Sequence, residues 1–467
     1  MASALIKEPS IKMRCHQVIR TFLFISASLG SPVPFYTSNE AQDAWDIFDK
    51  LSNISTSRFP FNAGIYQELS QLESMISDVA TGKIKPVSTI EEGLSVLSSI
   101  PQNNQTILQR AIDIVSLGLV PTNILDIING ITNHEINSIA NNNTKIPSPR
   151  IHPTNSFNDA PYDIPEETLR SAIHIPATFS YGKNSKIPIL LVPGTADPAG
   201  STYYFNYAKL FTTNPHTDPV WVNIPGNSLD DIQSNAEYVA YAINYISGLS
   251  RRPIGVLSWS QGSLDVQWAL KYWPSTRAAV SDFMAVSGDF HGTIVETMCV
   301  LAKSLCSPAV QQQGYDANFI RAMRGGDGDS AFVPTTSVYS GNDFIVQPQS
   351  GGLASGALGD VRGVGVSNVQ VQVACAGRAA GGSYSHSAML VNPLAYALFV
   401  DALVHDGPGR LERVDLDAVC RESVAPGLDV NDFLGMEAVS NVLGVLDILL
   451  YGFNRSEEPP LRDYVHH

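Results

Sequence analysis

A serine set between small residues is the first candidate for chemistry in this sequence. An apolar run from Ile254 ends in Ser258-Trp259-Ser260-Gln261-Gly262, and a segment that can form a helix follows as far as Tyr272. This is the pattern of a nucleophile elbow, where a strand delivers a serine to a tight turn and the next helix directs its N-terminal N–H groups at the same place. The usual form is Gly-x-Ser-x-Gly, and here Ser258 stands in place of the first glycine. The pattern predicts Ser260 as a nucleophile.

A serine hydroxyl needs a base to take its proton and an acid to orient that base. In chains with such an elbow the acid and then the histidine follow the serine, each after a strand. Asp343 comes directly after a strand-like run, and His386 ends the small-residue loop 381–385. The order therefore predicts a triad of Ser260, Asp343 and His386. Other downstream residues that could fill these roles are Asp282, Asp289, Asp327, Asp329, His291 and His405. His291 comes before Asp343 and His405 follows a helix-like run, and neither setting fits the pattern.

An acyl-transfer site also needs donors for the oxyanion. The backbone N–H of Gln261, next to the nucleophile, is one candidate. Thr195, in the turn after the apolar run 187–192, offers a backbone N–H and a hydroxyl. The sequence holds no Cys-x-x-Cys, no His-Glu-x-x-His and no Cys/His cluster, so we expect neither a metal nor a cofactor.

The elements that must carry these residues begin near residue 187. Short apolar runs there alternate with segments of helical spacing, which predicts a mostly parallel α/β sheet covered by helices on both faces. The strands expected are 187–192, 220–224, 254–259, 283–287, 337–339 and 369–373. Ligands of such sheets bind at the carboxyl ends of the strands, where Thr195, Ser260 and Asp289 fall.

The first third of the chain has a different pattern. Apolar residues recur at helical spacing between residues 41 and 143, and Thr89 followed by Glu92 predicts a capped helix start. We expect a small helical N-terminal domain or prosegment over residues 40–145, then a linker over 141–161 and a catalytic domain over 160–467. A sharper alternative is that the helical segment covers the mouth of the active site.

The N-terminus predicts a secretory signal peptide over residues 1–30, because basic residues precede a short apolar run that ends in small residues. Four glycosylation sequons fit a secreted glycoprotein. They begin at Asn53, Asn104, Asn142 and Asn454. The five cysteines are Cys15, Cys299, Cys306, Cys375 and Cys420. If Cys15 is removed or free, two bridges are possible, and counting leaves their connectivity open.

Composition narrows the classes of partner. The chain of 467 residues is 44% hydrophobic and 16% charged, which describes a globular protein. Its formal net charge of −15 argues against nucleic acid as a partner. No uncharged apolar stretch reaches the length of a membrane span. A neutral lipid or ester substrate stays compatible with this charge.

Taken together, the segments from about residue 187 to 403 resemble the Candida antarctica lipase B-like family of fungal lipases, which are α/β-hydrolases. The motifs that carry the resemblance are Ile189–Thr195, Leu257–Gly262, Gly288–Thr293, Val333–Ser340 with Asp343 and Ile345–Gln349, and Val369–Gln372 with Cys375. The elbow of that family also lacks the first glycine, so Ser258 fits it.

The resemblance implies the triad Ser260, Asp343 and His386, with Thr195 and Gln261 at the oxyanion hole. It also implies that Trp259 forms the floor of the alcohol pocket, that Asp289 lines the acyl side, and that Cys375 pairs with Cys420. Cys299 and Cys306 fall where the family has a mobile, lid-like helix and have no counterpart there, so the resemblance leaves a second bridge between them open. The apolar segment 430–453 would correspond to a helix at the pocket rim.

The expected function is a secreted serine hydrolase that cleaves carboxylic esters, with acylglycerols as the substrate class. Two other functions fit the same scaffold. One is another acyl-transfer enzyme, such as an acyltransferase or a peptidase. The other is a non-catalytic binding protein that keeps the fold.

Overall fold

The computed structural model describes residues 63–101, 105–124, 135–294 and 306–466. The predicted signal peptide, Cys15, Cys299 and the sequons at Asn53 and Asn104 lie outside these residues. No helix in the described ranges is both long and apolar enough to cross a membrane.

A seven-stranded sheet forms the centre of the molecule, with strand order β1-β3-β2-β4-β5-β6-β7. Every pairing is parallel except that of β1 with β3. The strands are β1 (Ile173–His174), β2 (Ile187–Val192), β3 (Thr217–Val222), β4 (Ile254–Trp259), β5 (Val280–Val286), β6 (Thr335–Tyr339) and β7 (Val366–Gln370). The predicted mostly parallel sheet is therefore confirmed.

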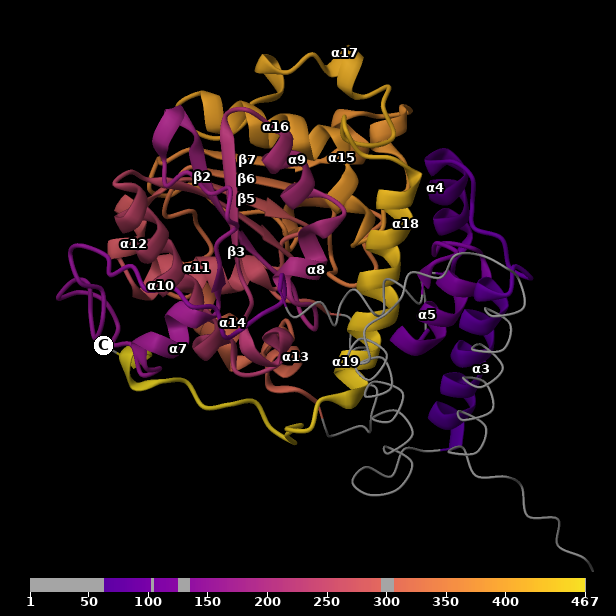
Figure 1. Cartoon of the computed structure of the whole chain (residues 1–467), viewed down its shortest axis with the longest axis horizontal. Coiled ribbons are helices and arrows are strands. Elements are labelled where there is room, and N and C mark those ends of the chain that lie inside the picture. The colour runs from indigo at the N-terminus through magenta and orange to yellow at the C-terminus, as the bar shows by residue number, and fades with distance from the viewer. Residues whose placement is uncertain (1–62, 102–104, 125–134, 295–305, 467) are drawn as a thin grey trace, which may run out of the picture.

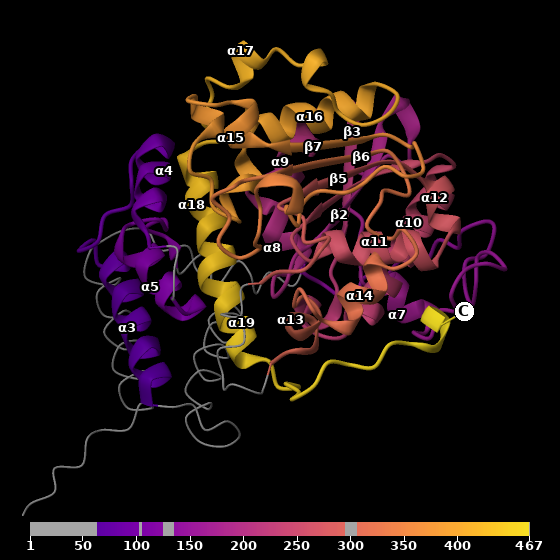
Figure 2. The same cartoon turned by 180° about the vertical axis from the view of Figure 1, so that it is seen from behind.

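Helices cover both faces of the sheet (Figures 1 and 2). On one face lie α10 (Ile232–Ser250), α11 (Gly262–Tyr272) and α12 (Ser275–Ala279). On the other lie α8 (Ala199–Tyr204), α9 (Tyr207–Thr213) and α16 (Pro393–Val404). The smaller helices include α7 (Glu166–Ser171), α13 (Pro308–Gln312), α14 (Asn318–Arg324), α15 (Val371–Ala374) and α17 (Leu416–Val419).

The alternation of side chains along the strands divides the core in two. In β2, Leu190 belongs to the apolar cluster under α10 and α11, whereas Leu191 belongs to the cluster on the opposite face. Val256 and Leu257 of β4 divide in the same way. Since successive side chains of a strand point to opposite faces, the unbroken apolar runs of these strands are what a sheet covered on both sides requires.

Strand β7 differs from the expected run 369–373. It pairs with β6 only as far as Gln370, which lies opposite Tyr339, the last residue of β6. Beyond that point the chain has no partner strand and coils into α15, which leaves Val373 72% exposed. The Val-Gln alternation there follows a strand period, but strand pairing depends on the length of the neighbouring strand.

The described N-terminal helices are α3 (Ala63–Ala80), α4 (Ile90–Ser99) and α5 (Ile107–Ser116). Helix α4 begins as predicted, with the Thr89 side chain accepting a hydrogen bond from the backbone N–H of Glu92. These helices lie beside the C-terminal helices α18 (Val430–Ala438) and α19 (Gly444–Leu450) in both views (Figures 1 and 2). Their apolar side chains join the cluster on the α16 face of the sheet. The domain boundaries expected from the sequence stay a prediction.

The predicted rim helix 430–453 is interrupted. A π-helical turn, η8 (Val439–Leu443), separates α18 from α19. Such turns often occur at functional sites, because the extra residue re-aims the side chains around it.

Candidate active site

Ser260 stands on a tight turn between β4 and α11. Its φ of 55° lies in the left-handed region, which non-glycine residues rarely adopt, and its backbone N–H donates to the Val286 carbonyl at 3.1 Å. The turn needs Gly262, since a Cβ there would lie 2.4 Å from the Pro193 carbonyl oxygen. Ser258, which replaces the usual glycine, is buried and its hydroxyl lies 2.9 Å from that of Ser263. The local sequence therefore makes the elbow that the motif predicts.

Asp343 and His386 are joined by a short hydrogen bond. The His386 Nδ1 lies 2.6 Å from the Asp343 Oδ2. The other carboxylate oxygen of Asp343 accepts the backbone N–H groups of Ile345 at 2.8 Å and Val346 at 3.0 Å. An ionised carboxylate only accepts, so Nδ1 carries the proton and Nε2 is left as the acceptor. This is the tautomer that a general base for a serine requires.

The backbone of His386 is fixed by two further hydrogen bonds. Its carbonyl oxygen accepts the indole Nε1–H of Trp259 at 3.2 Å and the hydroxyl of Ser287 at 3.1 Å. The centroids of the Trp259 and His386 rings lie 5.1 Å apart. Trp259, the residue next to Ser260, thus also holds the loop that carries the imidazole.

Glu437 on α18 also holds this loop. Its Oε1 accepts the hydroxyls of Ser385 at 3.0 Å and Ser387 at 2.9 Å, the two neighbours of His386. Its Oε2 accepts the Asn441 amide at 2.9 Å. Glu437 is fully buried, and this burial raises the pKa of its carboxyl to about 7. The only sequence signal for Glu437 is that it is an acid within the apolar segment 430–453, and this signal does not indicate which residues it contacts.

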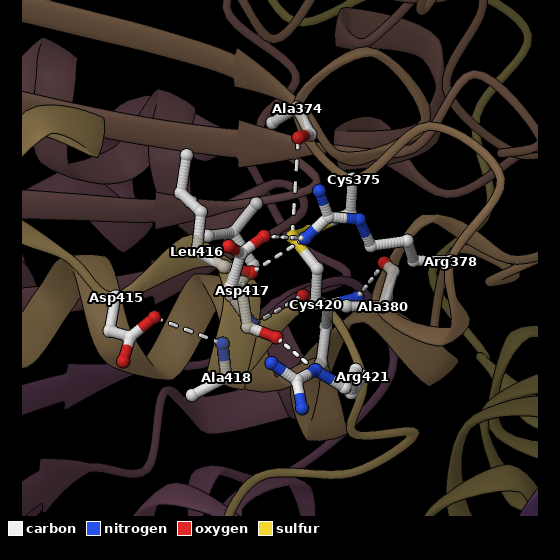
Figure 3. The surroundings of a disulfide bond; sticks show 12 residues. Ala374, Cys375, Arg378, Ala380, Asp415, Leu416, Asp417, Ala418, Cys420 and Arg421 are labelled. Atoms are coloured by element: carbon white, nitrogen blue, oxygen red, sulfur yellow. Dashed lines mark hydrogen bonds and ion pairs between the residues drawn. A yellow bond between two sulfur atoms is a disulfide. The ribbon is translucent and has the colours of Figure 1, made fainter.

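A disulfide between Cys375 and Cys420 anchors the chain ahead of His386 (Figure 3). The backbone N–H of Ala380 donates to the Cys420 carbonyl at 3.2 Å, and Arg378 forms an ion pair with Asp417 at 2.8 Å. The loop that carries the imidazole therefore starts from a covalently fixed point. This pairing is the one that the family resemblance implies, whereas the guessed partner of Cys306, Cys299, lies outside the described residues.

The oxyanion candidates lie beside the elbow. The Thr195 hydroxyl donates to the Gln261 Oε1 at 2.7 Å, and the Gln261 Nε2 donates to the Ser228 carbonyl at 2.9 Å. Gln313 donates to the Thr195 oxygen at 3.0 Å. The side chain of Gln261 thus holds Thr195, and the backbone N–H groups of both residues have no acceptor among the described residues. The Thr195 hydroxyl has to leave Gln261 before it can donate to an oxyanion.

Ser260 and His386 face one cavity, which encloses about 580 Å³ free of protein atoms, part of it open to solvent. Residues on its wall are Ile107, Arg110, Thr195, Asp197, Trp259, Phe344, Ile345, Ser387, Ser440, Asn441, Gly444, Val445 and Ile448. In the described chain no hydrogen bond joins the Ser260 hydroxyl to the imidazole. Contacts of this kind often close only when substrate binds.

Two known proteins are similar to this chain. The crystal structure of Aspergillus fumigatus lipase B matches the chain with a TM-score of 0.83 and 46% sequence identity, over 90% of this chain and 99% of that one. The chain belongs to the lipase B family of fungal lipases. Lipase B of Pseudozyma antarctica is 36% identical over 189 residues, which are 40% of this chain and 54% of that protein. The chain thus spans about half the length of this curated relative, and no protein-family model matches it. The predicted family and its α/β-hydrolase fold are confirmed.

Within this lipase B fold, Asp289 does not take the place expected of it. It is fully buried and accepts the Ser355 hydroxyl at 3.4 Å, and it is not among the described residues that line the cavity. Burial and the nearby charge of Asp343 raise the pKa of its carboxyl well above the ordinary value. The strand end predicted the turn but not the direction of this side chain.

Two ionisable side chains on the cavity wall are not singled out by the sequence. Asp197, on the turn after β2, is fully buried, and burial together with nearby Asp447 raises the pKa of its carboxyl. Arg110 comes from α5, in the N-terminal segment. Trp259 also lies on the cavity wall, and its role as the floor of an alcohol pocket stays a prediction.

Proposed function

We propose that this chain is a serine hydrolase that cleaves carboxylic esters through an acyl-enzyme, with triacylglycerols as its natural substrate class. The observation that carries the proposal is the 2.6 Å contact between the His386 Nδ1 and the Asp343 Oδ2, in a cavity that also holds Ser260 on a strained elbow. The lipase B relatives support an ester as the substrate.

In the proposed mechanism the Ser260 oxygen attacks the ester carbonyl while the His386 Nε2 takes its proton. Asp343 keeps the imidazole in the required tautomer and stabilises the imidazolium. The negative charge on the carbonyl oxygen is met by the backbone N–H groups of Thr195 and Gln261, and by the Thr195 hydroxyl once it has left the Gln261 Oε1. The imidazolium then protonates the leaving alkoxide. Water, deprotonated by the same imidazole, releases the acid from Ser260.

The cavity wall fits a substrate with an apolar acyl chain. Ile107, Trp259, Val445 and Ile448 contribute apolar surface around the serine. We also propose that the protein is secreted. The Cys375–Cys420 bridge supports this, because disulfides persist mainly in oxidising compartments.

Substitution of the nucleophile tests the proposal. Ser260→Ala should lower kcat on 4-nitrophenyl butyrate by more than about 10⁴-fold, because a triad without its nucleophile loses nearly all of its rate. Ser263→Ala is the matched control, since this serine lies one turn further on and does not line the cavity. Retained turnover in Ser260→Ala, with a fluorophosphonate probe failing to label the unmodified protein, would refute the assignment.

A further inference from the structure

Arg110 is a cation on the wall of the active-site cavity with almost no partners. It lies on α5, is only 6% exposed, and lines the same cavity as Ser260 and His386. Its guanidinium stacks on the Phe344 ring, with its central carbon 2.9 Å from the ring centroid. Phe344 directly follows Asp343 in the chain. The N-terminal helices thus bring a positive charge to the site of proposed catalysis.

The hydrogen-bonding capacity of this guanidinium is largely unused. One Nη1–H donates to the Pro101 carbonyl at a long 3.4 Å, and the buried Nε has no acceptor among the described residues. No carboxylate in the described chain comes within ion-pair distance of it. Buried polar groups are nearly always hydrogen-bonded, and a buried charge without a partner costs several kcal/mol. The unused donors therefore need an explanation.

The acids whose charge acts on Arg110 are occupied elsewhere. Glu437, Asp343 and Asp113 act on it only through their longer-range charge, and Asp113 accepts hydrogen bonds from Gln105 and Gln109. Glu437 already accepts Ser385, Ser387 and Asn441, and Asp343 accepts His386 and two backbone N–H groups. Burial lowers the pKa of Arg110 to about 10, so the guanidinium keeps its charge at neutral pH.

We propose that Arg110 forms a subsite for a carboxylate carried by the ester substrate, so that half-esters of dicarboxylic acids are favoured over neutral esters of the same length. The planar guanidinium fork matches the two oxygens of a carboxylate, and such charge-assisted bonds are strong where water is excluded. Arg110 also lines a second, smaller cavity together with Ser383. The inference rests on the proposed ester hydrolysis and adds a class of anionic esters to the triacylglycerols proposed above.

General electrostatics do not produce this preference. The net charge of −15 repels anionic substrates from the molecule as a whole. A preference for a charged ester would therefore have to arise from a local group such as Arg110.

The test compares two series of esters at pH 7.5. One consists of mono-4-nitrophenyl esters of glutaric to suberic acid, and the other of the same esters with the free carboxyl capped as a methyl ester. Arg110→Met removes the charge and the donors but keeps the length and apolar body of the side chain. Arg321→Met is the matched control, because it removes the same charge from a 61% exposed side chain on α14.

We expect the kcat/KM ratio of charged to capped ester to fall at least ten-fold in Arg110→Met, for at least one chain length, and to change less than two-fold in Arg321→Met. An unchanged ratio in Arg110→Met would assign Arg110 a purely packing role over Phe344 and overturn the inference. An equal fall in both variants would assign the effect to long-range charge and also overturn it.

The unmodified protein provides a measurement that does not depend on how the variant folds. It should cleave the charged ester at least ten-fold faster than the capped ester at one chain length or more, and a preference for the capped ester at every length contradicts the inference. The proposed function fails separately, if the unmodified protein cleaves neither series.

Discussion

The buried carboxyl of Glu437 should make stability depend on pH in a way that one substitution isolates. Its pKa is raised by burial from 4.5 to about 7, so the folded protein keeps a proton that the unfolded chain releases at lower pH. Where the folded state binds more protons, the free energy of unfolding decreases as pH rises. This contribution is complete below pH 4.5 and is lost between pH 4.5 and about 7.

The magnitude follows from the size of the shift. One pKa unit corresponds to 1.36 kcal/mol, so a shift from 4.5 to about 7 amounts to about 3 kcal/mol. Glu437→Gln does not titrate and keeps an oxygen acceptor for the hydroxyls of Ser385 and Ser387. Its new amide group would face the Asn441 amide, a conflict of about 1–2 kcal/mol that does not depend on pH. The difference in the free energy of unfolding between variant and wild type therefore changes with pH only through the titration of Glu437.

The assay is urea unfolding of both proteins at pH 4.5 and 7.5, followed by tryptophan fluorescence. From pH 4.5 to pH 7.5, we expect the free energy of unfolding of the wild type to decrease by about 3 kcal/mol relative to that of Glu437→Gln. Glu412→Gln is the control, because Glu412 is exposed on η7 (Leu411–Arg413), and its difference from wild type should not change with pH. A Glu437→Gln difference that stays constant to within about 0.5 kcal/mol would refute the reasoning.

Three further outcomes follow from the site. Thr195→Val should lower kcat on 4-nitrophenyl butyrate about 100-fold. This loss is near the low end for an oxyanion donor, because the Thr195 hydroxyl must first leave its acceptor. An unchanged kcat would exclude the Thr195 hydroxyl as a donor. Gly262→Ala should destabilise the protein by about 2 kcal/mol or more in urea unfolding, since the new methyl group would meet the Pro193 carbonyl at 2.4 Å. Replacing Cys375 and Cys420 by alanine should cost about 4 kcal/mol, from the entropy of a loop with sequence separation 45, and equal stability of variant and wild type would contradict this.

The sequence was most informative where the chemistry depends on neighbouring residues. The elbow at Ser260 needs a buried strand, small flanking residues and a following helix, and all three can be recognised locally. Strand β2 was expected with the bounds that the structure shows. Asp343 and His386 could be selected because chain order restricts which acid and which histidine can follow such an elbow.

The groups that surround the triad could not be selected in this way. Arg110 and Glu437 belong to helices whose sequence pattern only indicates a buried face, and it is tertiary packing that brings them to the imidazole loop. The resemblance implies Asp289 on the acyl side, but a turn after a strand does not fix where its side chain points. The end of β7 depended on the length of β6.

Helix α5 contributes part of the cavity wall, so a truncation that removes this helix also removes part of the cavity. Ile107 and Arg110 stand on that helix, and its apolar face belongs to the same core as the sheet. A recombinant fragment that starts after residue 160 would keep every atom of the predicted triad. It would also expose to solvent the apolar surface that α5 covers. We expect such a fragment to aggregate, and to accept bulkier acyl groups with less discrimination if detergent keeps it in solution.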